Sequence, residues 1–321
     1  MIGALKGARR SAAKHARSSS NVSVSPLWAR AYRGYSGAVP DHPGKRRLLR
    51  LLHEVGLRSG RPFACEMANG AWLAIRPQEG ILVSETVGWT CFTRRAWDPH
   101  IEACIRTILR PGDCAIDVGA NLGYFTAVMA QCVGPSGRVW SLEPVTETFE
   151  LLELCRSLNG YTQVTPLNLA LGATHGSIEI TYDNRHSGIA TMHADQVAGN
   201  TRRVELRPLD ELVSSSEVGR RPDLMKVDVE GHEFDVLRGA SKTIAEALPA
   251  IVFEFNERTA RVAGWTLAQA AELLVSLGEY SFSLIDESGT RPLDPFTFHL
   301  EPDARLDPHV DVLARPARGR R

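Results

Sequence analysis

The chain has 321 residues, of which 43% are apolar and 23% are charged. This length allows one large α/β domain with its own core and a short appendage, and it leaves little room for a second independent domain. Lys and Arg together number 37, as do Asp and Glu, so the chain as a whole has no net charge that would attract nucleic acid. We therefore expect no nucleic-acid partner.

The first segment, residues 1–45, is basic and rich in Ser and Ala, and no acidic residue precedes Asp41. We interpret it as a disordered leader, with an organelle-targeting peptide as the alternative. It lacks the apolar core of a secretory signal, and no stretch of the sequence is long and apolar enough for a transmembrane helix. The six cysteines show no CxxC spacing, which is typical of reduced thiols in a cytoplasmic protein. Residues 316–321 form a basic tail.

Residues 46–98 differ in pattern from the rest of the chain. A helical pattern over 47–52 leads into short alternating runs such as residues 71–75. Alternation of apolar and polar residues indicates half-buried strands. We expect a small, strand-rich N-terminal cap before the main domain, which spans residues 99–315.

Strands and helices alternate through the main domain. The apolar patterns predict strands at 114–118, 138–142, 164–169, 224–229 and 250–255, with helices at 99–109, 122–132, 147–158 and 267–277. Parallel neighbouring strands require such crossover helices, so the fold class is α/β, with a doubly wound, mostly parallel, Rossmann-like sheet.

Three further features complete this expectation. Short strands and turns between residues 172 and 210 indicate an insertion near the site. Thr266 and Gln269 predict a capping box at the start of the last helix. Residues 280–285 and 310–313 can close the sheet as an antiparallel pair.

A glycine-containing turn, Asp117-Val118-Gly119-Ala120-Asn121-Leu122-Gly123, follows the first strand of the main domain. Open α/β sheets bind ligands at this edge, and we expect Gly119 and Gly123 to let the backbone and the next helix approach a nucleoside. Asp117 suits an ammonium group or a bridging water and would repel a pyrophosphate. This turn therefore favours a ligand with a cationic end.

Two more polar residues end neighbouring strands. Glu143 follows the second strand, where its two carboxylate oxygens can accept both ribose hydroxyls. Asn168 ends the third strand and either reads an adenine edge with its amide or holds a turn. The turn lacks the full G-x-G-x-x-G pattern, so a ligand with one ribose and a cationic end fits these residues better than NAD does.

Five blocks of sequence then match one family in order. They are 117–126, Leu142-Glu143-Pro144, Leu209-Asp210-Glu211-Leu212, Lys226-Val227-Asp228-Val229-Glu230-Gly231-His232-Glu233 and 236–240. From about Asn69 to Ala314 the chain resembles the FkbM-type methyltransferases, which are class I enzymes that depend on S-adenosylmethionine (SAM). The resemblance implies SAM as the cofactor, bound by Asp117, Gly119, Asn121, Gly123, Glu143 and Asn168. It also implies methyl transfer to hydroxyl groups of small molecules, sugars or lipid-linked glycans.

Methyl transfer to an alcohol requires a base or a metal ion to activate the hydroxyl. His232 is our candidate general base because its side chain titrates nearest to neutral pH. Asp228 and Glu230 would project from the same side of an ideal strand and position the acceptor or the sulfonium. With Glu254 and Asn256 on the next strand they offer hard oxygen ligands, so Mg²⁺ is possible, although no specific motif supports a metal site.

Three other functions stay open. The chain could methylate protein or nucleic acid, although it lacks the Asn/Asp-Pro-Pro-Tyr/Phe tetrapeptide of amino-methylating nucleic-acid enzymes. It could be an NAD-dependent oxidoreductase, which Asp117 opposes. It could also bind SAM without turnover, as a non-catalytic partner protein. The acceptor, the metal dependence and the oligomeric state do not follow from the sequence.

Overall fold

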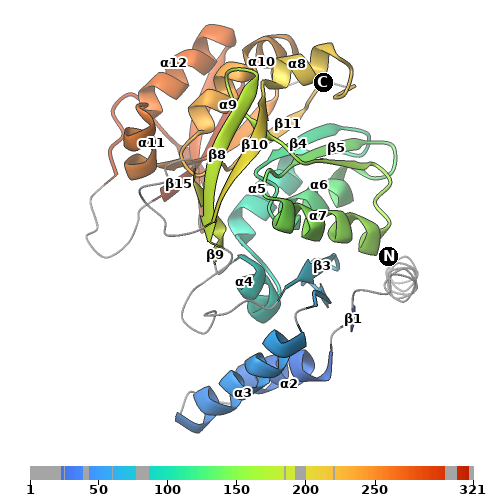
Figure 1. Ribbon diagram of the computed structural model, residues 1–321. Coiled ribbons are helices and arrows are strands. Elements are labelled where there is room, and N and C mark those ends of the chain that lie inside the picture. The colour runs from blue at the N-terminus through green and yellow to red at the C-terminus, as the bar shows by residue number, and fades with distance from the viewer. Residues whose placement is uncertain are drawn as a thin grey trace.

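The computed structural model describes residues 23–24, 26–38, 43–59, 61–76, 87–183, 186–191, 200–219, 221–300 and 309–317. Most of the predicted leader, residues 1–45, and most of the predicted tail, residues 316–321, lie outside these ranges. Figure 1 shows a central α/β domain with two N-terminal helices at one end of the molecule.

An eight-stranded sheet forms the centre of the main domain, in the order β14-β13-β15-β12-β11-β4-β5-β6. Five neighbouring strands are parallel, and β15 pairs antiparallel with both β12 and β13. This arrangement confirms the mostly parallel class I methyltransferase sheet and its antiparallel closing pair. The strands are β4 (Cys114–Val118), β5 (Arg138–Leu142), β6 (Val164–Leu167), β11 (Leu224–Val227), β12 (Ala250–Asn256), β13 (Tyr280–Asp286), β14 (Gly289–Pro292) and β15 (His309–Pro316).

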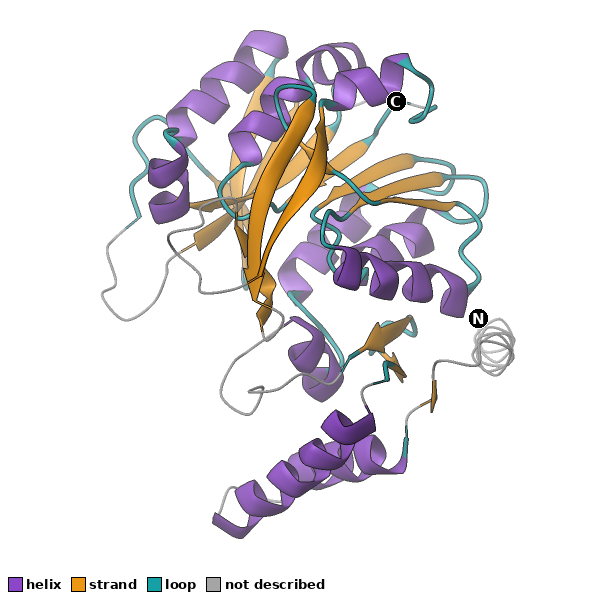
Figure 2. Cartoon of the chain, in the orientation of Figure 1, coloured by secondary structure: helices purple, strands orange, loops and turns teal. Residues whose placement is uncertain are grey.

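Helices cover both faces of this sheet (Figure 2). Alternate residues of the strands belong to two separate apolar clusters; in β4, for example, Ala115 packs in one cluster and Ile116 in the other. This period of two is the reason that the sheet is buried on both sides. One face packs against α5 (Pro99–Ile108), α6 (Tyr124–Val133) and α7 (Thr146–Asn159). The other packs against α8 (Leu209–Ser214), α9 (Glu233–Gly239), α10 (Ser241–Ala247), α11 (Glu257–Ala263) and α12 (Leu267–Leu277).

Several element ends have identifiable causes. The predicted capping box is present at α12, where Gln269 N–H donates to Thr266 Oγ1 and Thr266 N–H donates to Gln269 Oε1. Helix α6 begins at Tyr124, two residues later than expected, because Gly123 has a φ of +93°. Strand β11 ends at Val227, two residues earlier than expected.

The N-terminal region contains the expected short strands together with more helix than expected. Strands β1 (Ser23–Val24), β2 (Phe63–Glu66) and β3 (Trp72–Ile75) form a separate small sheet. Around them lie α2 (Leu27–Ala38), α3 (Pro43–Ser59) and α4 (Val87–Arg94). The helical pattern seen over residues 47–52 is the centre of α3, which extends well beyond it in both directions.

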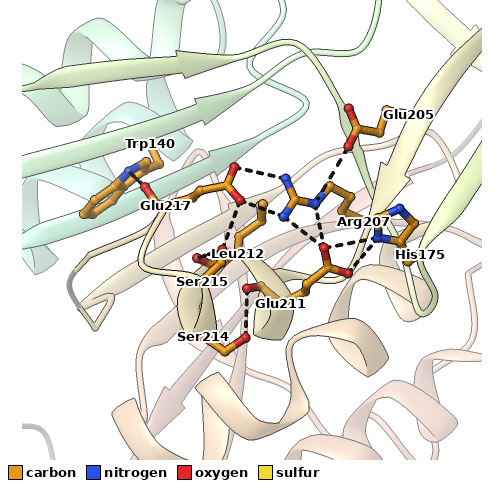
Figure 3. A network of polar contacts seen from close by, with 9 residues as sticks. All are labelled: Trp140, His175, Glu205, Arg207, Glu211, Leu212, Ser214, Ser215 and Glu217. Carbon is orange, nitrogen blue, oxygen red and sulfur yellow. Dashed lines mark hydrogen bonds and ion pairs between the residues drawn. The ribbon is translucent and has the colours of Figure 1, made fainter.

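The predicted insertion is a second sheet, in the order β7-β10-β8-β9. Its strands are β7 (Ala170–Leu171), β8 (Gly176–Asp183), β9 (His186–Thr191) and β10 (Asn200–Arg207). Arg207 ties the sheet to α8, because its guanidinium donates to Glu217 at 2.7 and 3.0 Å and to Glu211 at 3.0 Å (Figure 3). His175 contacts the same Glu211 carboxylate at 2.8 Å. These contacts fix the base of the insertion beside the main sheet.

Candidate active site

The carboxyl ends of the parallel strands β4, β5, β6, β11 and β12 meet at one edge of the sheet. The antiparallel strand β15 brings its first residues to the same edge, where Asp311 is the register partner of Glu254. Open α/β sheets bind ligands at such an edge. All the site residues predicted from the sequence lie on these strand ends or on the turns that follow them, so this edge is the candidate active site.

The glycine turn after β4 is held tightly by neighbouring backbone. Gly119 has a φ of +77°, and a Cβ added there would lie 1.8 Å from the carbonyl oxygen of Asp228. Gly123 has a φ of +93°, and its added Cβ would lie 2.9 Å from Leu152 of α7. The close neighbours of both glycines are protein atoms, so packing of the protein itself requires glycine at these two positions. The expected approach of a nucleoside to this turn stays a prediction.

Asp117 lies in β4 and is fully buried. Its Oδ2 accepts a hydrogen bond from Thr126 Oγ1 at 2.6 Å, whereas its Oδ1 accepts none from the described residues. Burial raises the pKa of Asp117, and the nearby Lys226 ammonium opposes that shift. Asp117 therefore holds an acceptor atom inside the protein that the neighbouring described side chains leave unsatisfied.

Glu143 follows β5 and is 6% exposed. Its Oε2 accepts from Asn121 N–H at 3.0 Å and its Oε1 accepts from Val145 N–H at 2.9 Å. Burial raises the pKa of Glu143 to about 7, and these two backbone hydrogen bonds oppose the shift. Each carboxylate oxygen can still accept a second hydrogen bond. Glu143 thus joins the glycine turn to the start of α7.

Asn168 follows β6 and holds a turn. Its Nδ2 donates to the carbonyl oxygens of Glu143 and Pro144 at 2.8 and 3.1 Å. This is one of the two roles expected from the sequence. The side-chain oxygen is the atom of this amide that would accept a hydrogen bond from an adenine amino group.

The turn after β11 brings Asp228 next to Lys226. Lys226 Nζ lies 2.8 Å from Asp228 Oδ2 and 4.7 Å from the ring centroid of Phe125. Burial acts to lower the pKa of Lys226, but the carboxylates of Asp228 and Asp117 outweigh it and raise that pKa. The buried Lys226 cation therefore interacts with a carboxylate of β4 and with one of the turn after β11.

Glu230 departs from the geometry expected of it. Because β11 ends at Val227, Asp228 and Glu230 do not project from one strand, and Glu230 has a φ of +54° in a turn. The expectation that they share a strand face is therefore wrong. The turn is held by Glu233, whose Oε1 accepts from Val229 N–H at 3.1 Å and from Gly231 N–H at 3.0 Å. Burial raises the pKa of Glu233 to about 7.

His232 lies at the residue before α9, and its side chain is 12% exposed. Its Nδ1 is 3.9 Å from Asp235 Oδ2. Both residues line a cavity of about 270 Å³ between α9 and the insertion, together with Thr174, Arg238 and the apolar side chains of Leu171 and Leu206. The expected base thus faces this cavity, whereas Asp228 faces Lys226.

Glu254 and Asp311 are functional candidates that the sequence alone did not bring together. They are register partners on β12 and β15, half-buried, and no described residue donates a hydrogen bond to either carboxyl. Burial, followed by the charges of Asp228 and Glu230, raises the pKa of Glu254 well above its usual range. Burial also raises the pKa of Asp311 to about 8. Their only signal in the sequence is an acidic residue within each of two apolar strands.

The described part of the chain contains no cluster of acidic, His or Cys side chains that would form a metal site. No group of three or more His, Cys, Asp or Glu residues there is spaced to hold a metal ion. Asn256, which we considered as a possible ligand, uses its Oδ1 to accept from Arg258 and Thr259 N–H at the start of α11. Mg²⁺ binding therefore stays only the possibility that the sequence left open.

The family of the chain follows from its sequence blocks. The methyltransferase FkbM domain matches residues 117–284, which is more than half of the chain and includes every site residue predicted from the sequence. The chain belongs to the FkbM methyltransferase family. It is therefore a SAM-dependent methyltransferase, as the resemblance implied.

The chain is similar to three known proteins. The chain is 25% identical to Methyltransferase 1 of Beauveria bassiana over 48% of its length and 69% of that protein. It is 32% identical to the hexuronic acid methyltransferase AglP of Haloferax volcanii, over 41% of this chain and only 52% of that protein. The crystal structure of methyltransferase FkbM from Methylobacillus flagellatus is 15% identical, with a TM-score of 0.42 over 89% of this chain and 58% of that one.

Within the described ranges, no helix is both long enough and apolar enough to cross a lipid bilayer.

Proposed function

We propose that this FkbM family member transfers the methyl group of SAM to a hydroxyl oxygen of a small-molecule, sugar or lipid-linked glycan acceptor. One observation carries the proposal. The sheet edge has two neighbouring sides. On the proposed cofactor side, hydrogen bonds hold the carboxyl groups of Asp117 and Glu143. On the proposed acceptor side, the carboxyl groups of Glu254 and Asp311 receive no hydrogen bond from the described residues. A neutral hydroxyl compound can donate to the oxygens of these acidic side chains, and it can accept from them where they are protonated.

The residues of the cofactor side fit SAM. The unsatisfied Oδ1 of Asp117 suits the ammonium end directly or through water. Glu143 keeps lone pairs for the ribose hydroxyls after accepting the N–H of Asn121. Gly119 and Gly123 shape the turn, and the oxygen of Asn168 is suited to the adenine amino group. Bound SAM supplies a methyl group on a sulfonium, which a nucleophile attacks in line.

The acceptor hydroxyl must lose its proton as it attacks. We assign His232 as the general base, because its ring faces the cavity at the start of α9 and lies beside the carboxylate of Asp235. Asp228 and Glu230 would hold the acceptor by accepting hydrogen bonds from its other hydroxyls. Lys226 Nζ donates to Asp228 Oδ2 at 2.8 Å and so orients that carboxyl group. The relative AglP is named for a hexuronic acid, which supports a sugar as one acceptor class.

The first test is isothermal titration of the purified protein with SAM and, separately, with NAD. We expect SAM to bind, and Asp117→Asn and Glu143→Gln to weaken that binding. Glu150→Gln is the matched control, because Glu150 is an exposed carboxylate on the nearby helix α7 that pairs with Arg76. Binding of NAD without SAM would show the cofactor assignment to be wrong.

The second test separates an enzyme from a non-catalytic SAM-binding protein. Methyl-labelled SAM is incubated with a panel of neutral sugars, uronic acids, lipid-linked glycans, protein and RNA. Label in an ether of a sugar or small molecule is the expected result. Label only in protein or RNA would overturn the acceptor class, and tight SAM binding with no labelled product from any acceptor would favour the non-catalytic alternative.

A further inference from the structure

Helix α3 carries an apolar face that no described part of the protein covers. Leu48, Leu51 and Val55 are 39%, 53% and 53% exposed. Their spacings of three and four residues place them on one face of the helix. Leu27, at the start of the neighbouring helix α2, is 81% exposed. Leu48, Leu51 and Val55 form a row of large apolar side chains on the surface of α3, and such a group marks an interaction site.

The other side of this helical pair is anchored in the protein. In α2, Tyr32 is buried and the Trp28 ring packs edge-on against Phe63 of β2, with 5.1 Å between ring centroids. A Cβ at Gly56 of α3 would lie 2.6 Å from the Trp28 ring, so the two helices cross in close contact. The pair lies at the end of the molecule opposite α8, α10 and α12 (Figure 1). The exposed face of α3 is therefore held outward.

Basic residues are concentrated in the part of the sequence that contains α2 and α3. Residues 1–50 contain 11 Lys and Arg but only one acidic residue, Asp41, although the whole chain has 37 of each sign. The remaining residues are thus acidic overall, and the candidate active site is rich in carboxylates. Arg47 and Arg58 are exposed on α3 itself. An apolar helical face within a basic segment is the pattern of a helix that lies in the interface of an anionic membrane.

We propose that α3 docks the protein onto the surface of an anionic lipid bilayer, with Leu48, Leu51 and Val55 entering the boundary of the acyl chains and the exposed Arg47 and Arg58 facing the lipid headgroups. The apolar face distinguishes this partner from nucleic acid, whose phosphates need cations but not exposed Leu and Val. A second copy of the chain is disfavoured, because a two-fold contact between α3 faces would bring two basic segments together. The surface is independent of the acceptor chemistry proposed above.

The test is co-sedimentation of the full chain with lipid vesicles. One set contains phosphatidylcholine alone, and the other also contains about 30% phosphatidylglycerol, which supplies the negative charge. We expect binding to the anionic vesicles only, and weaker binding as salt is added. Leu51→Ser with Val55→Ser should lower the affinity by about tenfold or more, because two inserted apolar side chains are lost.

Matched control variants test whether vesicle binding depends on α3 in particular. Val262 and Val275 are 46% and 49% exposed on α11 and α12, so Val262→Ser with Val275→Ser removes similar apolar area elsewhere and should bind as the parent does. Arg47→Glu tests the charge without touching the apolar face, and should also weaken binding. Circular dichroism should be the same for all variants, because every substituted side chain is exposed.

Several results would overturn the proposal. These are no binding to anionic vesicles, binding that the Leu51 and Val55 substitutions leave unchanged, or equal loss in the control pair. A change from dimer to monomer in analytical ultracentrifugation on substituting Leu51 and Val55, without an effect on lipid binding, would assign the face to a second copy. Binding of single-stranded RNA that depends on the same two residues would assign it to nucleic acid.

Discussion

Carboxyl groups line both halves of the site edge, but the protein holds them differently on the two sides. On the side of β4 and β5, Asp117 accepts the Thr126 hydroxyl and Glu143 accepts two backbone N–H groups. On the side of β12 and β15, Glu254 and Asp311 are neighbours that receive no hydrogen bond from the described residues. The first half is organised before any ligand arrives, whereas the second half keeps its hydrogen-bonding capacity for one.

This difference has an energetic meaning. Hydrogen bonds from backbone and hydroxyl groups compensate for burying a carboxylate, as on the cofactor side. Burial, and then the like charges nearby, raise the pKa values of Glu254 and Asp311 and oppose their ionisation. An acceptor that donates hydroxyl hydrogen bonds would relieve that cost. We therefore expect changes on the first side to affect folding and SAM binding, and changes on the second to affect turnover and pH dependence.

The largest effect should come from the glycine turn, where the two halves touch. Gly119→Ala places a Cβ against the carbonyl of Asp228 at a positive φ, so we expect a loss of about 3 kcal/mol or more in the free energy of unfolding. Gly160→Ala is the control, because Gly160 also has a positive φ (+65°) but no atom lies within 4 Å of its added Cβ. It should cost only about 1 kcal/mol. Equal losses in urea unfolding would show that the contact with Asp228 does not matter.

The next largest effect should be on turnover, and it should distinguish the two halves of the site. His232→Gln should lower kcat by about a hundredfold, as removal of a general base does, while the Kd for SAM stays unchanged. His175→Gln is the control, since His175 is 61% exposed and contacts Glu211 away from the strand ends. This prediction is checked by initial rates on an acceptor found in the labelling panel. A similar loss of SAM affinity in His232→Gln would move this residue to the cofactor side.

The pH dependence of stability tests the acceptor side directly. Burial raises the pKa of Asp311 from 3.8 to about 8, so the folded chain binds this proton more tightly than the unfolded chain. The resulting stability is complete below the unfolded pKa and is lost as pH rises through about 8. Asp311→Asn should therefore be more stable than the parent at about pH 9, and this difference should shrink as pH falls from about 8 towards about 4.

Asp286 is the control for that measurement, because its pKa is shifted in the opposite direction. Ser288 and Arg291 lower the pKa of Asp286 to about 2, so the stability it contributes is lost only in acid. Asp286→Asn should leave the alkaline part of the curve unchanged in thermal unfolding. An Asp311→Asn curve that runs parallel to that of the parent would show that Asp311 does not titrate in this range.

The smallest effect should be the pH dependence of SAM binding. The pKa of Glu143 is raised to about 7 by burial, and ribose hydroxyls donate best to its ionised form. The affinity for SAM should therefore rise about tenfold between about pH 6 and pH 8, as the carboxylate ionises. Glu143→Gln should bind weakly with no such slope, by titration calorimetry. A slope that survives this substitution would assign the effect to another group.

Local sequence was enough to predict the parallel sheet, the antiparallel pair of β13 and β15, the capping box of α12 and the family. These follow from periodicity, turn residues and short motifs, which depend on neighbours in the chain. The same local signals placed Asp117, Glu143 and Asp228 at strand ends. Their roles in binding and catalysis stay proposals, tested by the experiments above.

Tertiary structure alone decided the rest. Glu254 and Asp311 are 57 positions apart, and only the antiparallel pairing of β12 with β15 makes them partners. Gly119 needs to be glycine because the Asp228 carbonyl lies against it, and Glu230 leaves the strand because the turn closes on Glu233. Burial and the distances between charges arise from packing across the sheet, which no single stretch of sequence encodes. The sequence therefore determined which residues reach the site edge, and packing decided which of their charges are satisfied there.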